Sequence, residues 1–108
     1  MKILSKNTII NIVKDISNKE SIHGLRIVGI FGSYAQGTET DFSDVDIAYK
    51  IDHSIFSKKY KDGFSKLLHI DYVKELLQEK LHKKVDFISL NSNNLKLNQS
   101  ILKDIIYV

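Results

Sequence analysis

The sequence predicts an α+β fold (α/β-like) in which a small mixed β-sheet is flanked by helices. Apolar residues with helical spacing alternate along the chain with short β-branched and aromatic runs that are typical of strands. The length of 108 residues, 43% of them hydrophobic, is enough for one core. Because no linker, repeat or low-complexity tract divides the chain, we expect a single domain over residues 1–108.

The N-terminal half is predicted to form a helix and then two strands. Asn7 or Thr8 would cap the helix. Its apolar face would consist of Ile9, Ile12, Val13 and Ile16. Residues 25–31 and 45–51 have the composition of strands. Between them, residues 33–43 are rich in Gly, Ser, Thr and Asp and predict a turn and a loop.

The C-terminal half is predicted to form a helix, a strand and a second helix. Helical spacing of apolar residues indicates the first helix over residues 66–82. These residues are Ile70, Val73, Leu76, Leu77 and Leu81. Residues 84–90 predict the strand, and apolar residues within 95–106 predict a closing helix that starts near Leu97. The polar segment 52–65 is the least certain part of the pattern.

Two acidic residues lie at the start of the second predicted strand. Asp44 and Asp46 are spaced i, i+2, so on a strand they would point to the same face. Two neighbouring carboxylates repel each other unless a cation lies between them, and carboxylates are ligands that suit Mg²⁺. The alternative is a solvated edge strand, or a loop position for Asp44.

Asp86 is the third candidate acid, in a predicted strand that is otherwise apolar. It shares one side of that strand with Ile88 and Leu90, which argues against an acid that is only a solvated surface residue. If this strand lies beside the second one, Asp86 completes a three-acid cluster. The alternative is a single buried acid that is paired with a lysine.

A Gly-Ser turn closes the first predicted strand. Gly32 permits a close backbone approach and a positive φ angle. Ser33 offers a hydroxyl and is expected to begin a short helix whose N–H groups face an anion. Most Gly-Ser pairs are only turns, but a turn close to paired carboxylates suits divalent cations and a phosphate chain.

The composition argues against several classes of protein. The chain has no cysteine, which excludes disulfides and thiolate zinc sites. Neither a signal pattern nor an apolar run near ~18 residues is present, so we expect no membrane span and a cytoplasmic location. A net charge of only +3 and the lack of an aromatic-basic stripe disfavour nucleic acid as a partner.

Two segments, Ile30–Gly37 and Ser43–Ile47, together resemble the signature of the nucleotidyltransferase superfamily related to DNA polymerase β. Within it, the chain is similar to the minimal nucleotidyltransferases, often described as MntA-like antitoxins. The similarity covers nearly the whole chain, because Asp62–Ser65, Lys83–Phe87 and Ile101–Val108 also match the usual pattern. It implies a polymerase β-like nucleotidyltransferase fold with the site on one sheet face.

The resemblance also implies the chemistry. Asp44 and Asp46 would hold two Mg²⁺ ions, and Asp86 would bind one of them and accept the proton of the attacking hydroxyl. Gly32 and Ser33 would contact the β- and γ-phosphates of ATP. The products would be an AMP ester and pyrophosphate.

The usual partner in this family is a HEPN ribonuclease toxin. The resemblance therefore implies that AMP is transferred to a tyrosine of such a toxin, in a hetero-oligomer of the two chains. Two other functions stay open, namely a toxin-binding antitoxin without catalysis and a nucleotidyltransferase that acts on a small molecule or RNA. Gln36 stands where the family usually has arginine, which puts the catalytic rate in question more than the fold.

Overall fold

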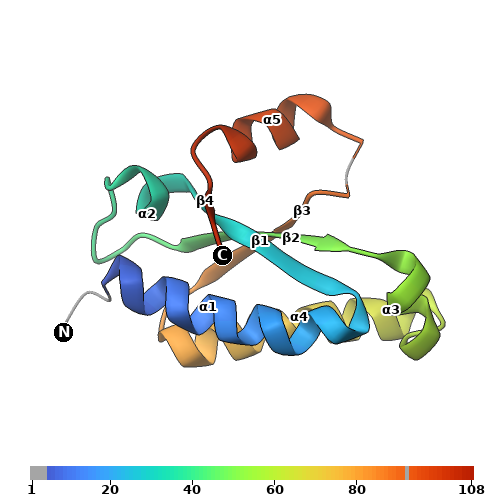
Figure 1. The fold of residues 1–108 in the computed structure, drawn as a ribbon. Coiled ribbons are helices and arrows are strands. Elements are labelled where there is room, and N and C mark those ends of the chain that lie inside the picture. Colours follow the sequence, from blue (N-terminus) through green and yellow to red (C-terminus); the bar gives the residue numbers. More distant parts are fainter. Residues whose placement is uncertain (1–4, 92) are drawn as a thin grey trace.

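One mixed four-stranded sheet organises the molecule, with helices on both of its faces (Figure 1). The structure is a computed structural model that describes residues 5–91 and 93–108. The strands are β1 (Leu25–Phe31), β2 (Val45–Ile51), β3 (Val85–Ser89) and β4 (Ile106–Tyr107). Their spatial order is β3-β2-β1-β4, with β2 and β3 parallel and the other neighbours antiparallel. The predicted fold class is confirmed.

Helices α1 (Lys6–Glu20) and α4 (Gly63–Leu81) cover one face of the sheet and form the main core with it (Figure 1). Both carry their apolar side chains at helical spacing, as the sequence predicts. The fully buried members of this core include Val13, Val73, Leu77, Ile47 and Val85. A buried hydroxyl, Ser17 Oγ, accepts from the N–H of Ile27 at 3.0 Å and donates to its carbonyl at 3.3 Å, which joins α1 to β1.

The other face of the sheet carries α5 (Leu95–Lys103), while α2 (Gly32–Gln36) lies at one end of β1 (Figure 1). The chain then returns as β4 along the free edge of β1. A Cβ on Gly29 would overlap the carbonyl of Ile106, so only glycine allows this close return. At the far end of the sheet lie η1 (Ser21–His23) and α3 (His53–Lys59).

Several predicted boundaries are wrong. Ser5, not Asn7 or Thr8, caps α1, because its hydroxyl accepts from the N–H of Thr8 at 3.1 Å. The polar segment 52–65 forms α3 and the first turn of α4, whose N-terminus has a capping box between Asp62 and Ser65.

The C-terminal prediction also needs correction. Helix α5 begins at Leu95 and ends at Lys103, and β4 follows where the closing helix was expected to continue.

Among the described residues, no helix combines the length and the apolarity that crossing a membrane would require.

Candidate active site

Asp46 and Asp86 lie directly opposite each other on neighbouring parallel strands. Val45, Ile47 and Val85 point into the core beneath the sheet. Because side chains alternate along a strand, the two acids point to the opposite face, which also carries α5. The predicted neighbourhood of the second and third strands is confirmed, and it brings together two acids that are far apart in the chain.

Asp44 lies one residue before β2, which begins at Val45. The predicted strand 45–51 is confirmed, and of the two interpretations of Asp44 the loop position holds. The loop end is nevertheless fixed, because the N–H of Val45 donates to the carbonyl of Lys84 at 2.9 Å. Asp44 is half-buried and lies near the start of β3.

The electrostatics of Asp46 identify a strained carboxylate pair. The pKa of the Asp46 carboxyl is raised to about 6, first by partial burial, then by a hydrogen bond to Asp86 and its charge, and last by the charge of Asp44. These effects all disfavour the charged form of Asp46. A cation between the two carboxyls would remove the repulsion between them.

Asp46 and Asp86 form a contacting pair with Asp44 beside it, and the three acids do not form a closed metal-binding site. In residues 5–91 and 93–108, no three His, Cys, Asp or Glu side chains come close enough to hold a metal ion. Asp44 acts on Asp46 only through its charge, whereas Asp86 touches Asp46. The predicted three-acid cluster is thus a contacting pair with Asp44 beside it. These all-oxygen donors fit a hard cation such as Mg²⁺.

The Gly-Ser turn lies against the same carboxylate. Phe31, the last residue of β1, pairs with Asp46, so the chain turns into α2 beside this acid. Gly32 has a φ of +72°, and a Cβ there would overlap Asp46 Oδ2. The expectation that a short helix starts here is confirmed, although α2 begins at Gly32 and not at Ser33. Buried Tyr34 anchors α2 in the core.

Gln36 connects α2 with the end of α5. Its side-chain amide donates to a carboxylate oxygen of Asp104 at 3.4 Å. The residue that departs from the usual arginine therefore still links the two elements above the sheet. This link is a neutral donor on an acid, so it lacks the charge that an arginine would supply.

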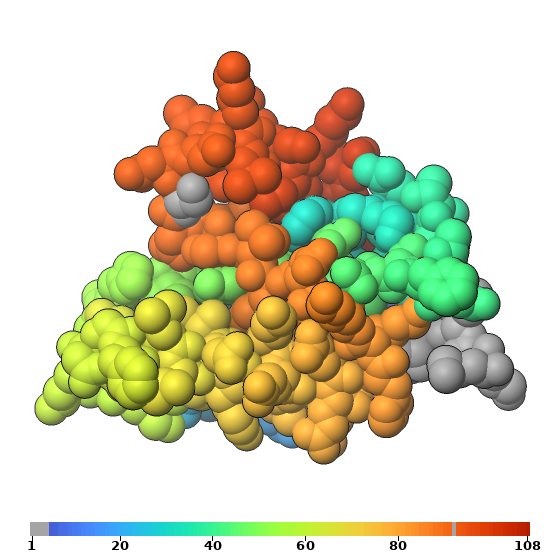
Figure 2. All heavy atoms as spheres, turned by 180° about the vertical axis from the view of Figure 1, so that it is seen from behind, coloured from blue at the N-terminus to red at the C-terminus, as the bar shows by residue number. Residues whose placement is uncertain are grey.

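The acids lie on an open surface. Three hollows of about 490, 390 and 280 Å³ are lined by other residues, the largest by Arg26, Lys50 and Asp52 at the far end of the sheet. Figure 2 shows α5 standing above α4, with β3 and the loop after α2 between them. A ligand at the acids would therefore leave one side open to a second molecule.

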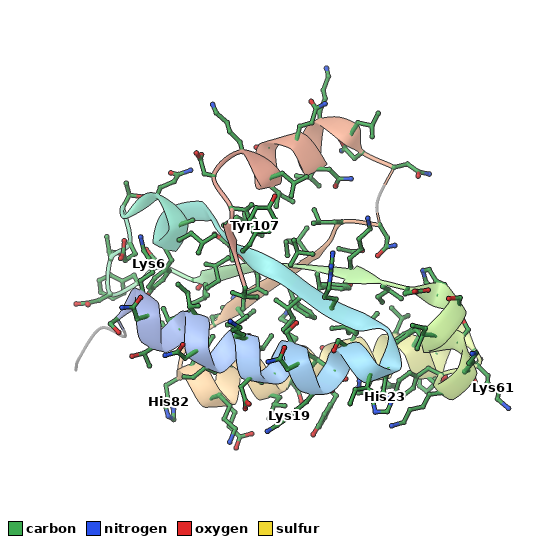
Figure 3. All side chains as sticks on the ribbon, in the orientation of Figure 1. Lys6, Lys19, His23, Lys61, His82 and Tyr107 are labelled. Carbon is green, nitrogen blue, oxygen red and sulfur yellow. The ribbon has the colours of Figure 1, made fainter. Side chains whose placement is uncertain are left out.

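The histidines contribute nothing to this site. His69 forms a half-buried contact with Glu20 at 2.8 Å, which ties α4 to α1. His23 and His82 lie on the helical side of the molecule, away from the face that carries α5 (Figure 3).

Comparison with known proteins identifies the class of protein. The sequence model of the family "Polymerase beta, Nucleotidyltransferase" matches residues 5–108. The chain therefore belongs to the polymerase beta nucleotidyltransferase family. A candidate protein adenylyltransferase of Methanocaldococcus jannaschii is 35% identical over 85 residues, which cover 78% of this chain and 77% of the relative. The resemblance inferred from the two motifs is confirmed.

Solved structures share the fold. A candidate minimal nucleotidyltransferase superposes with a TM-score of 0.74 at 22% identity, covering 97% of both chains. A toxin-antitoxin crystal structure with AMP-PNP has a TM-score of 0.62 at 27% identity, covering 96% of this chain and 72% of that one. A tri-AMPylated Shewanella oneidensis HEPN toxin in complex with its MNT antitoxin gives 0.62 at 20% identity, covering 94% and 70%. The first and third, below 25% identity, show the fold alone.

Proposed function

We propose that this chain transfers AMP from ATP to a tyrosine hydroxyl of a HEPN ribonuclease toxin, with Mg²⁺, and so acts as its antitoxin. The observation that carries the proposal is the contact between Asp46 and Asp86 beside the Gly32 turn. The adenylyltransferase relative supports AMP as the transferred group. The similar toxin-antitoxin structure with AMP-PNP supports an adenine nucleotide and a toxin partner.

The carboxylates would hold the metal. Asp46 and Asp86 offer adjacent oxygen ligands, and Asp44 lies close enough to add its charge. Bound Mg²⁺ supplies charge neutralisation on the phosphates and lowers the pKa of the attacking hydroxyl. The pKa of Asp46 is raised first by partial burial and then by the hydrogen bond and charge of Asp86, and a bound cation would oppose these effects.

The protein's own groups would position the reactants. Gly32 brings its backbone against the Asp46 carboxylate without a side chain in the way, which leaves room for a phosphate chain beside the acids. Its N–H and the Ser33 hydroxyl would bind the β- and γ-phosphates. The acceptor oxygen attacks the α-phosphorus, the bond to the β-phosphate oxygen breaks, and pyrophosphate leaves. The exposed Asp86 carboxylate accepts the hydroxyl proton.

A protein acceptor suits the shape of the site. The Asp86 side chain is exposed and Asp46 is half-buried, so the acids can be reached from the surface by a group on another protein. A toxin docked over the acids would supply the missing wall and present its tyrosine. The catalytic site would then be complete only in the hetero-oligomer.

Intact mass spectrometry tests the proposal. A HEPN toxin is incubated with the chain, ATP and MgCl₂, and we expect AMP-sized mass additions that map to tyrosine. The variant Asp46→Asn should give none, because it lacks a carboxylate that would bind the cation. A reaction with EDTA should also give none, because EDTA removes the cation itself. If the toxin is neutralised without any mass addition, and the variant neutralises it equally well, the chain is an antitoxin that acts by binding alone.

A further inference from the structure

Phe42 is the most exposed large hydrophobic residue in the described chain. Its side chain is 94% exposed, in the loop between α2 and β2 and two residues before Asp44. An aromatic ring in water is unfavourable by roughly 1.5–3 kcal/mol compared with a buried one. In the sequence, an aromatic residue inside a loop rich in Gly, Ser, Thr and Asp is a signal that could have indicated this position.

The loop around Phe42 is braced. The N–H of Thr40 donates to Ser43 Oγ at 2.8 Å, and the N–H of Ser43 donates back to the carbonyl of Thr40 at 3.1 Å. The N–H of Phe42 itself donates to Thr40 Oγ1 at 3.2 Å. From outside the loop, Lys83 Nζ donates to the carbonyl of Asp41 at 2.5 Å. These bonds fix the backbone of the loop around Phe42, whose ring lies in solvent.

The braced loop lies at the end of the sheet that carries the acids. Before β3, Lys83 donates to the carbonyl of Asp41 in this loop, and the carbonyl of Lys84 accepts from the N–H of Val45, the first residue of β2. Asp46 and Asp86 are the second residues of these two strands. A molecule that touches Phe42 is therefore next to the reacting groups.

We propose that Phe42 is the anchor that docks the protein acceptor, by inserting into an apolar recess beside the acceptor's hydroxyl. The proposal rests on the proposed function and names a contact that aligns the acceptor. A nucleotide base is the weaker occupant, because a base stacks on one face of a ring and would leave most of a residue that is 94% exposed in water. A protein brings its own concave surface, and buried aromatic anchors carry much of the affinity in protein interfaces.

The test compares Phe42→Ala with a matched control, Phe64→Ala. Phe64 is also an exposed phenylalanine, 73% exposed, but it lies in the first turn of α4. The probes are the HEPN toxin of the preceding test, for affinity and AMP transfer, and AMP-PNP with Mg²⁺, for thermal stabilisation. For Phe42→Ala we expect toxin affinity to fall about 10- to 30-fold, as for an aromatic hot spot. KM for the toxin should rise similarly, with kcat and the AMP-PNP shift unchanged.

The variant Phe42→Tyr should keep most of the affinity, because it keeps the ring. A weaker AMP-PNP shift in Phe42→Ala would place the ring on the nucleotide and overturn the proposal. An equal loss in Phe64→Ala, or no loss in Phe42→Ala, would overturn it as well, and so would a wild-type chain that does not bind the toxin. If the wild type binds without transferring AMP and Phe42→Ala weakens that binding, the proposed activity fails while the anchor stands.

Discussion

Replacing Gly32 by alanine tests how tightly the turn is fitted to the acid beside it. Gly32 has a φ of +72°, in the left-handed region, and its missing Cβ would overlap Asp46 Oδ2. Gly37 provides a matched control, because its φ is +76° but a Cβ added there would have no atom within 4 Å. The two substitutions share the backbone penalty, and only the first meets a carboxylate.

The magnitudes follow from these two differences. A non-glycine residue in the left-handed region costs roughly 1–2 kcal/mol, which applies to Gly32→Ala and Gly37→Ala alike. Moving the Asp46 side chain away from the new methyl group forces it off its rotamer and adds about 0.5–1.5 kcal/mol. We therefore expect Gly32→Ala to lower the free energy of unfolding by about 2–3 kcal/mol, and Gly37→Ala by about 1–2 kcal/mol.

Urea unfolding of both variants without added metal measures the difference. In the Asp46→Ala background the overlap is gone. There, Gly32→Ala should lower the free energy of unfolding by no more than Gly37→Ala does in the wild type. AMP transfer by Gly32→Ala should fall at least tenfold, because the displaced carboxylate no longer faces Asp86. Equal stability of Gly32→Ala and Gly37→Ala would refute the fit between the turn and the acid.

The other predictions concern the acid pair and the core. The pKa of Asp46 is raised from 3.8 to about 6, so without metal the free energy of unfolding should fall as pH rises through this interval, and Asp46→Asn should remove that slope in urea titrations. Ser17→Ala leaves the buried N–H and carbonyl of Ile27 without their partner and should cost about 1–3 kcal/mol by urea unfolding, whereas the exposed Ser21→Ala should cost far less. Leu77→Ala opens a cavity in the core and should cost about 2–5 kcal/mol in the same assay.

The parts of the fold with strong periodicity were predictable from the sequence. The strands at 25–31 and 45–51 agree with β1 and β2 to the residue, because β-branched runs bounded by turn residues leave little ambiguity. The contact between Asp46 and Asp86 could not be predicted from local pattern alone, since it depends on parallel pairing of two distant strands. Local pattern does not determine such pairing, and the prediction was correspondingly conditional.

The errors arose where tertiary contacts override local pattern. Ile105 and Ile106 continue the helical spacing of Ile101 and Leu102, which favours a longer closing helix. The free edge of β1 instead takes Ile106 and Tyr107 as a short strand. The position of Asp44 stayed open because carboxylates at i, i+2 have the same spacing on a strand and on the loop that leads into it.

The side-by-side placement of Asp46 and Asp86 makes the chemistry of this protein depend on strand alignment. Inserting or deleting one residue in the turn before β3 would exchange the faces of that strand, which would send Asp86 toward the helices and Val85 toward solvent. A shift by two residues would keep the faces but separate the carboxylates by one step along the sheet. Indels in this short turn are therefore expected to abolish activity even when the chain still folds.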